Sequence, residues 1–384
     1  MKDYLYLQSK YVVPSYANRG LTIVRGQGVH LFDVEGNKYL DLMSNYGVNI
    51  FGYGHSQINS TIINQLKRLT NLHGSFTSDI RAEASEKLVK RCGEAYGKVY
   101  WSNSGAEAID AALKFAALST NRKKFVAAKN SFHGKTLGAL SATGIEKYRK
   151  AYEPLLWQFV QVDYNEADQL KNAVDEKTAA VILEPIQGEA GVIVPDKKYL
   201  RKVEVSCREA GTLLILDEVQ TGVGRTGWFL ASHADSVEAD IICLGKGLAG
   251  GLSVGATIMT NELAKKIPKS SHTSTLGGNP LVCAGVLATL KSLDEKILQH
   301  IKKTGRYLIN SLKSIKSDLI VEIRGEGLMI GIQVSKDRDR ILKDLQKNGV
   351  LAIPAADDVV RFLPPYIISK KQIDEAISVF RKVL

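Results

Sequence analysis

Two short stretches of the sequence place a carboxylate and an amine where each could do chemistry. Residues 213–216 are an apolar run that ends at Asp217, and residues 241–244 are a second run, followed closely by Lys246 between two glycines. Each run is long enough for a buried strand and too short for a helix. Strands buried on both faces are typical of parallel sheets, and α/β folds bind their ligands at the carboxyl ends of such strands. Asp217 and Lys246 are therefore predicted to lie where such a fold binds its ligand.

A lysine that leaves the end of a buried strand is suited to covalent chemistry. Poor solvation lowers the pKa of its ammonium group, and the neutral amine can attack a carbonyl group to form a Schiff base. A nearby carboxylate that holds a pyridinium nitrogen is the usual partner of a lysine that binds pyridoxal phosphate. The alternative is an ion pair between Asp217 and Lys246 with a purely structural role, and these two stretches alone leave both interpretations open.

The elements that must position these residues alternate along the middle of the chain. Helical patterns at 168–174 and 199–210 fall between strand-like runs, and such alternation indicates a parallel sheet with crossover helices. The strand-like runs are 125–128, 159–162, 180–183, 213–216 and 241–244. We therefore expect an α/β fold whose central sheet is mostly parallel.

One junction between a strand and a helix could bind a phosphate group. Residues 99–102 form a strand-like run, and the alanine-rich helix expected after it opens at Ser104 and Gly105. A helix N-terminus offers free backbone amides to an anion. The alternative is an ordinary serine cap, which is the simpler explanation for this junction on its own.

Length and pattern predict the domain organisation. The chain has 384 residues, which is more than one hydrophobic core usually holds, so a large and a small domain are expected. We expect residues 1–50 to form an N-terminal arm and, through a β-meander, part of the small domain. Residues 51–280 would form the large domain. Residues 281–384, where long amphipathic helices and further strands follow one another, would complete the small α+β domain.

Net charge limits the choice of partners. The net charge is +11, and the lysines are scattered along the chain rather than gathered in one tract. This pattern favours acidic substrates or partners, and it is typical of a solvated surface rather than of a nucleic-acid site. No signal-peptide pattern and no apolar run of membrane-spanning length is found in the sequence, so we expect neither nucleic acid nor a membrane among the partners.

Cysteine and histidine spacing gives no sign of a metal site or a disulfide framework. The four cysteines lack paired spacing, and the seven histidines lack the spacing of metal ligands. We therefore expect reduced thiols in a cytoplasmic protein and no bound metal. His133 and His55 are predicted to be turn or core residues.

Several runs together resemble the class III aminotransferases, which are fold-type I enzymes that use pyridoxal phosphate and are related to acetylornithine and ornithine aminotransferases. The matching runs are 103–108 (NSGAEA), 131–136 (SFHGKT), 184–191 (EPIQGEAG), 216–227 (LDEVQTGVGRTG), 245–247 (GKG), 274–280 (STLGGNP), 324–331 (RGEGLMIG) and 361–365 (RFLPP). They extend over nearly the whole chain in the order of that family. The resemblance implies a large domain with a mostly parallel central sheet and a smaller α+β domain formed by both termini.

The resemblance assigns residues to the ring of the cofactor. It implies that Lys246 forms the Schiff base with pyridoxal phosphate and that Asp217 pairs with the pyridinium nitrogen. Gln220 would bind the 3-oxygen of the ring. Phe132 and Val219 would enclose the two faces of the ring.

The resemblance also assigns residues to the phosphate group and implies a second subunit. Ser104, Gly105 and Ala106 would bind the phosphate at the start of their helix, which agrees with the anion site considered above. Thr275 would reach the phosphate of the neighbouring subunit. The expected assembly is therefore a homodimer with shared active sites.

Substrate recognition, by the same resemblance, depends on cations. Arg361 resembles the arginine that binds the α-carboxylate of glutamate as a bidentate pair, and Glu189 resembles the acid that neutralises it while an ω-amine is bound. Lys135 stands where the family usually carries an arginine for the other carboxylate, and it keeps the charge but loses the planar fork. The remaining residues assigned to the substrate are Ser274, Tyr46 and Tyr16.

The reaction implied by the resemblance is the transfer of the ω-amino group of N-acetylornithine to 2-oxoglutarate, which gives N-acetylglutamate semialdehyde and glutamate in arginine biosynthesis. One alternative is a lysine or ornithine attached to an acidic amino-group carrier protein, as in lysine biosynthesis, and residues 123–128, 173–183 and 360–365 resemble that variant. Free ornithine and 4-aminobutyrate are further candidate donors. A glutamate-semialdehyde aminomutase would not need both Glu189 and Arg361, and a binding protein without turnover would not need Lys246, so both are less favoured.

Overall fold

The computed structural model describes residues 3–384, and its largest feature is a seven-stranded sheet with the order β4-β10-β9-β8-β7-β5-β6. The strands are β4 (Tyr96–Ser102), β5 (Lys124–Ala128), β6 (Gln158–Val162), β7 (Thr178–Leu183), β8 (Leu213–Asp217), β9 (Ile241–Leu244) and β10 (Gly255–Thr260). From β6 to β9 each strand is parallel to its neighbour, whereas β10 is antiparallel to both β9 and β4. The prediction of a mostly parallel central sheet is confirmed.

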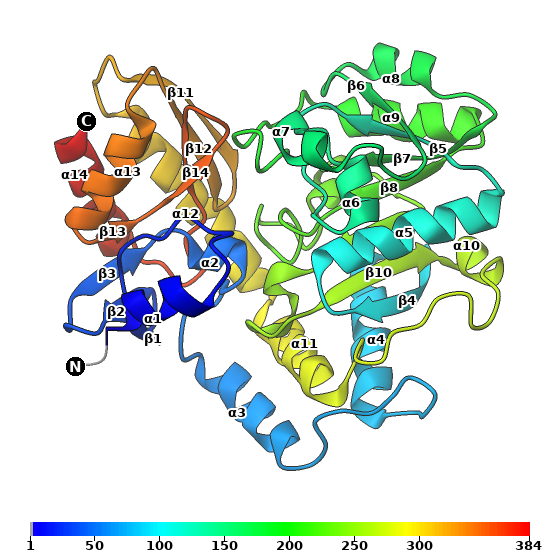
Figure 1. Ribbon diagram of the computed structural model, residues 1–384, viewed down its shortest axis with the longest axis horizontal. Helices are drawn as coiled ribbons and strands as arrows, with labels where there is room; N and C mark the ends of the chain where they lie inside the picture. Colours follow the sequence, from blue (N-terminus) through cyan, green and yellow to red (C-terminus); the bar gives the residue numbers. More distant parts are fainter. Residues whose placement is uncertain (1–2) are drawn as a thin grey trace.

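Side chains of each strand alternate between two packed layers. In β8, Ile215 packs with Ala108 of α5 on one face, while Leu214 and Leu216 belong to the cluster on the other face, which includes Leu88 of α4. Helix α5 lies across the sheet and contacts β7 to β10 (Figure 1). Because helices cover both faces, these strands are continuous apolar runs in the sequence.

From β4 to β8, one or two α-helices lie between successive strands, and further helices precede β4 and follow β10. These helices are α3 (Ser56–Leu66), α4 (Asp79–Cys92), α5 (Gly105–Thr120), α6 (Leu137–Ala142), α7 (Glu146–Arg149), α8 (Ala167–Ala173), α9 (Tyr199–Glu209), α10 (Asn261–Lys265) and α11 (Pro280–Ser292). The helices expected at 168–174 and 199–210 are α8 and α9, so both predictions are confirmed within one residue at each end.

Two four-stranded sheets form a smaller part beside the central sheet, on the left in Figure 1. The first has the order β1-β2-β3-β13, and it joins the N-terminal meander to a C-terminal strand because β13 pairs in parallel with β3. The second is antiparallel, with the order β11-β12-β15-β14. The strands are β1 (Ile23–Gln27), β2 (His30–Asp33), β3 (Lys38–Asp41), β11 (Ile320–Glu326), β12 (Met329–Val334), β13 (Val350–Leu351), β14 (Ile353–Ala355) and β15 (Val359–Phe362).

Both ends of the chain therefore contribute to the smaller part, as expected. Its helices are α1 (Tyr4–Tyr11), α2 (Ser44–Gly47), α12 (Glu295–Lys313), α13 (Arg338–Lys347) and α14 (Lys370–Val383). The division of the chain at residues 50 and 280 stays a prediction. Over residues 3–384, the helices are either too short or too polar to cross a membrane.

Candidate active site

The parallel pairing of β8 and β9 brings Asp217 and Lys246 to one edge of the central sheet. Asp217 is the last residue of β8 and pairs in register with Cys243, while Lys246 follows the end of β9 after Gly245. The two glycines beside Lys246 permit close packing. A Cβ atom on Gly245 would lie 3.2 Å from the Cα atom of Gly105, and one on Gly247 would lie 2.6 Å from a side-chain carbon of Ile50.

A cavity of about 290 Å³ opens at this edge. It is lined by Gly105, Ala106, Phe132, His133, Gly134, Lys135, Glu184, Asp217, Val219, Gln220 and Lys246. These residues come from loops that follow β4, β5, β7, β8 and β9 and from the ends of these strands. The structure thus gathers most of the residues that the sequence assigns to a cofactor ring and its phosphate group.

One end of the cavity is the N-terminus of α5. The hydroxyl group of Ser104 accepts a hydrogen bond from the amide of Glu107 at 3.2 Å, so Ser104 is the helix cap that the simpler explanation proposed. The amides of Gly105 and Ala106, in the first turn, have no carbonyl acceptor earlier in the helix. A Cβ atom on Gly105 would lie 2.7 Å from Val219, so a glycine is needed where these two walls meet.

Asp217 is held by a histidine and by a backbone amide. One carboxylate oxygen accepts a hydrogen bond from Nδ1 of His133 at 2.8 Å, and the other accepts one from the amide of Val219 at 3.0 Å. Both side chains of the Asp217–His133 pair are almost completely buried. Among the described residues, the side chain that is hydrogen-bonded to Asp217 is therefore His133, not Lys246, which disfavours the interpretation of a structural Asp–Lys pair.

Lys246 lies in the cavity wall with a positive φ of 44°. Burial lowers the pKa of its ammonium group, although the charges of Glu189 and Asp217 oppose this effect. A lowered pKa increases the fraction of neutral amine at a given pH, and only the neutral amine is a nucleophile. The structure therefore places Lys246 and the fixed carboxylate of Asp217 around one cavity, and their roles in a reaction stay predictions.

A second cavity, of about 800 Å³, shares Phe132, Lys135 and Lys246 with the first. Its lining also includes Tyr16, Tyr46, Asn130, Ile145, Lys147, Tyr148, Glu189, Ala190, Arg338, Pro354, Ala355, Ala356 and Asp357. The structure therefore places Tyr16, Tyr46, Lys135 and Glu189 around one space that reaches Lys246. Lys135 is exposed, and its Nζ atom lies 4.5 Å from the centre of the Tyr148 ring.

Arg361, on β15 of the second small sheet, is completely buried beside this space. Its guanidinium group donates to Oε1 of Glu189 at 2.7 Å and to Oε1 of Gln220 at 3.1 Å. Burial raises the pKa of Glu189, but the charge and the hydrogen bond of Arg361, together with the charges of Lys246 and Lys135, outweigh burial and lower the pKa overall. Glu189 is therefore ionised and covers a cation that could otherwise bind a carboxylate.

Four predicted site residues line neither cavity: Ser104 caps α5, Arg361 is buried beside the larger cavity, and Ser274 and Thr275 lie elsewhere in this chain. The hydroxyl group of Ser274 accepts a hydrogen bond from the amide of Gly277 at 3.0 Å and lies 3.4 Å from Nδ2 of Asn103. It lines a separate hollow together with Thr273 and His272. Thr275 is exposed. The resemblance had assigned Thr275 to the neighbouring subunit, so that assignment stays a prediction.

Sequence reasoning missed three residues that line the smaller cavity, His133, Gly134 and Glu184. His133 is indeed a core residue, as predicted, but its contact with Asp217 makes it part of the site. Glu184 is 5% exposed and lies at the end of β7. The missed residues belong to the runs 131–136 and 184–191, which carried the family resemblance, and that resemblance was the available signal. Their spacing alone does not indicate a role in the site.

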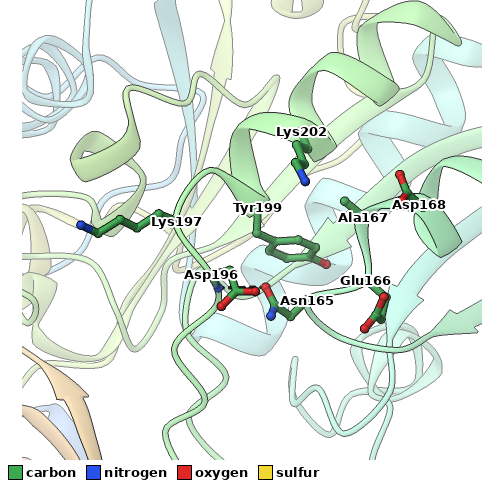
Figure 2. A pocket seen from close by; sticks show the side chains of 8 residues that line it. All are labelled: Asn165, Glu166, Ala167, Asp168, Asp196, Lys197, Tyr199 and Lys202. Atoms are coloured by element: carbon green, nitrogen blue, oxygen red, sulfur yellow. Dashed lines mark hydrogen bonds between the residues drawn. The ribbon is translucent and has the colours of Figure 1, made fainter.

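Another hollow, of about 120 Å³, lies at the starts of α8 and α9 and shares no residue with the cavities around Lys246 (Figure 2). Its lining contains three carboxylates and two lysines, and Lys197 points away from the other side chains. The residues are Asn165, Glu166, Ala167, Asp168, Asp196, Lys197, Tyr199 and Lys202. The mixture of charges favours no single class of ligand.

Comparisons with known proteins agree on one family. A family model of class III aminotransferases matches residues 11–384. The acetylornithine aminotransferase of Aquifex aeolicus (strain VF5) is 40% identical over 97% of this chain and 100% of its own length. The LysW-aminoadipate semialdehyde/glutamate semialdehyde transaminase of Sulfurisphaera tokodaii is also 40% identical, over 96% of this chain and 95% of its own. The crystal structure of ornithine aminotransferase from Toxoplasma gondii ME49 superimposes with a TM-score of 0.95 at 31% identity, over 99% of this chain and 94% of that one.

Proposed function

The chain belongs to the class III aminotransferases, and from this premise we propose that it transfers the ω-amino group of N-acetylornithine to 2-oxoglutarate. It is a transaminase that depends on pyridoxal phosphate, as enzymes of this family do. The observation that carries the choice of reaction is the contact of Arg361 with Glu189 beside Lys246. One cation that can be covered or exposed allows a single site to accept an ω-amine and then a 2-oxo acid.

The residues of the smaller cavity fit the cofactor. A cavity of about 290 Å³ joins a reactive lysine, a fixed carboxylate and a helix N-terminus that begins with a glycine. Lys246 would bind the aldehyde carbon, Asp217 would bind the ring nitrogen, and the amides of Gly105 and Ala106 would bind the phosphate group. When bound, pyridoxal phosphate supplies a carbonyl group that condenses with amines and an electron-poor ring that stabilises negative charge on the substrate carbon.

The side chains around the cofactor divide the remaining work. Phe132 and Val219 would enclose the ring, and His133 would keep Asp217 oriented toward the ring nitrogen. Once a substrate amine has replaced it, Lys246 would take the proton from the amine-bearing carbon and later return one, as base and then as acid. The lowered pKa of Lys246 favours the first of these roles.

Arg361 and Glu189 would decide which carboxylate is accepted. The ω-amine end of N-acetylornithine has no carboxylate that could bind Arg361. While this substrate is bound, Glu189 would therefore remain paired with Arg361 and neutralise its charge. When 2-oxoglutarate or glutamate binds, its α-carboxylate would displace Glu189 and form a bidentate pair with Arg361. Lys135, Tyr46 and Tyr16 would contact the far end of the substrate in the larger cavity.

A second candidate substrate is an amine attached to an acidic carrier protein. The relative from Sulfurisphaera tokodaii is named for LysW-linked semialdehydes, the net charge of this chain is +11, and the larger cavity has a volume of about 800 Å³.

We also propose a cytoplasmic homodimer in which Thr275 and Ser274 lie toward the site of the partner subunit. Within each subunit, residues 51–280 would be the large domain and the two ends of the chain the small one.

A single-turnover assay with the cofactor-loaded protein tests the proposed substrate. N-acetylornithine, ornithine, 4-aminobutyrate and a lysine attached to an acidic carrier are added separately, and absorbance follows the conversion of the cofactor to its amine form. We expect N-acetylornithine to react fastest. Conversion by the carrier-bound amine alone would replace the proposal with the second candidate, and no conversion by any donor would contradict both.

A further inference from the structure

Glu184 joins two loops of the active site through its carboxylate group. It lies just beyond the end of β7, next to β5 in the central sheet. Oε1 accepts a hydrogen bond from the amide of Phe132 at 2.9 Å, and Oε2 accepts one from the amide of Gly188 at 3.1 Å. Phe132 belongs to the loop after β5, whereas Gly188 immediately precedes Glu189.

The surroundings hold Glu184 firmly in this position. The hydroxyl group of Tyr164 donates to the carbonyl oxygens of Glu184 at 3.0 Å and Pro185 at 2.9 Å. Nε2 of Gln187 donates to the carbonyl oxygen of Lys129 at 2.9 Å, which is a second link between the same two loops. A buried carboxylate without hydrogen bonds is costly, so the two amides are where the charge of Glu184 is satisfied.

We propose that Glu184 is a positioning residue that acts through both loops, fixing Phe132 against the cofactor ring and Glu189 against Arg361. The second part rests on the proposed function, because it assumes that the contact of Glu189 with Arg361 selects between two kinds of amine donor. A glutamine at position 184 would keep one acceptor oxygen but would turn an NH₂ group toward the other backbone amide. One of the two hydrogen bonds would then be lost, and the side chain that bridges the loops would hold both of them less firmly.

The protonation of Glu184 gives a test that a purely structural role would not pass. Burial and the charge of Asp217 raise the pKa of Glu184, whereas His133 and the hydrogen bonds from the amides of Phe132 and Gly188 lower it, and the net pKa is about 7. The other charged or titratable groups that interact with it are Tyr164 and Lys246. Below this pH Glu184 carries a proton and loses acceptor capacity, so the wild-type protein should approach the behaviour of E184Q.

The main measurement is the ratio of two single-turnover rates of the cofactor-loaded protein, the rate with N-acetylornithine divided by the rate with L-glutamate. We expect E184Q to lower this ratio about tenfold, which corresponds to about 1.4 kcal/mol, because Arg361 is covered less well. The circular dichroism of the bound cofactor should change as well, since Phe132 is held less firmly. In wild type the ratio should rise as pH increases through about 7, and in E184Q it should not.

A double variant shows whether the effect passes through Glu189. If it does, E184Q should change the ratio little in a protein that already carries E189Q, since the effects of residues acting as a unit are not additive. Independent effects that multiply would overturn the proposal, as would an unchanged ratio and an unchanged dichroism in E184Q. If E184Q does not fold, the wild-type pH series decides, and a constant ratio and dichroism across pH 7 would overturn the proposal.

Asp240→Asn is the matched control. Its carboxylate also accepts a backbone hydrogen bond from a neighbouring strand, from the amide of Leu214 at 2.8 Å, and burial also raises its pKa. It precedes β9 at the opposite end of the sheet from the cavity. We expect D240N to lower stability but to leave the ratio unchanged. If N-acetylornithine proves not to be the substrate, the proposal for Glu184 can still be tested. The dichroism of the cofactor and the double variant can then be examined with any ω-amine that reacts.

Discussion

Replacing Glu189 with glutamine should change the substrate preference of the enzyme more than its stability. Arg361 is completely buried, and its two contacts are Oε1 of Glu189 at 2.7 Å and Oε1 of Gln220 at 3.1 Å. A hydrogen bond to a charged group contributes about 1.5–3 kcal/mol. Because the side-chain oxygen of the glutamine could still accept a hydrogen bond from the guanidinium group, we use the lower end of this range, which corresponds to roughly a tenfold change in rate.

The direction follows from which ligand competes for Arg361. Under the proposed function, the α-carboxylate of glutamate would have to displace an ionised Glu189 in the wild-type protein, whereas N-acetylornithine would leave the pair intact. E189Q should therefore speed the half-reaction with glutamate about tenfold relative to that with N-acetylornithine. The assay is single-turnover conversion of the cofactor with each amine alone, over a range of concentrations that separates binding from the rate of conversion.

A second glutamate–arginine pair provides the control for E189Q. Glu322 pairs with Arg324 on β11, where more than half of the Glu322 side chain is exposed. E322Q should leave the ratio of half-reactions unchanged. An unchanged ratio in E189Q, or a change that favours N-acetylornithine, would refute the argument that Glu189 covers Arg361 against substrate carboxylates.

Four further variants test other parts of the site. Lys246→Ala should abolish turnover and the absorbance of the lysine-bound cofactor. The thermal unfolding temperature of the unloaded protein should stay similar or rise, since a buried amine is removed. A retained absorbance would contradict the role of Lys246 in binding the cofactor. His133→Asn should weaken cofactor binding about tenfold in an equilibrium titration because Asp217 loses its partner, and unchanged affinity would argue against this support. Because the pKa of Glu184 is raised in the native state, the native protein without cofactor keeps a proton that the unfolded state releases. The free energy of unfolding of the wild-type protein should therefore fall by about 3 kcal/mol as pH rises from 4.5 to about 7. Denaturant titrations at each pH measure this change, and E184Q should lack it. Lys135→Arg should tighten binding of 2-oxoglutarate through a bidentate contact, and an unchanged KM for this acid would show that the side chain does not reach it.

The central sheet and the reactive pair could be predicted because their signals are local. The run 213–216 and the run 241–244 are each apolar throughout, since helices cover both faces of the sheet, and each is followed by the residue that does chemistry. Asp217 and Lys246 meet because parallel strands end at the same edge. The order of the strands and the antiparallel direction of β10 could not be predicted, because pairing between distant segments leaves no mark on a single strand.

The support of the reactive residues could not be predicted from spacing. His133 is separated from Asp217 by 84 residues, and Glu184 from Phe132 by 52. Their side chains meet only because β5, β7 and β8 are neighbours in the folded sheet. A buried histidine and a buried glutamate are each compatible with a satisfied core position, and only their contacts distinguish that position from a role in the site.

The covered arginine lies where the two parts of the subunit meet. Glu189 follows a strand of the central sheet, whereas Arg361 lies on β15 of a small sheet. Arg225 makes a separate connection between the same parts, because its guanidinium group donates to the carbonyl oxygens of Leu328 at 3.1 Å and Pro364 at 2.7 Å. This second connection does not involve a carboxylate that a substrate could replace. Under the proposed function, Arg361 would exchange Glu189 for a substrate carboxylate while Arg225 keeps the two parts in contact.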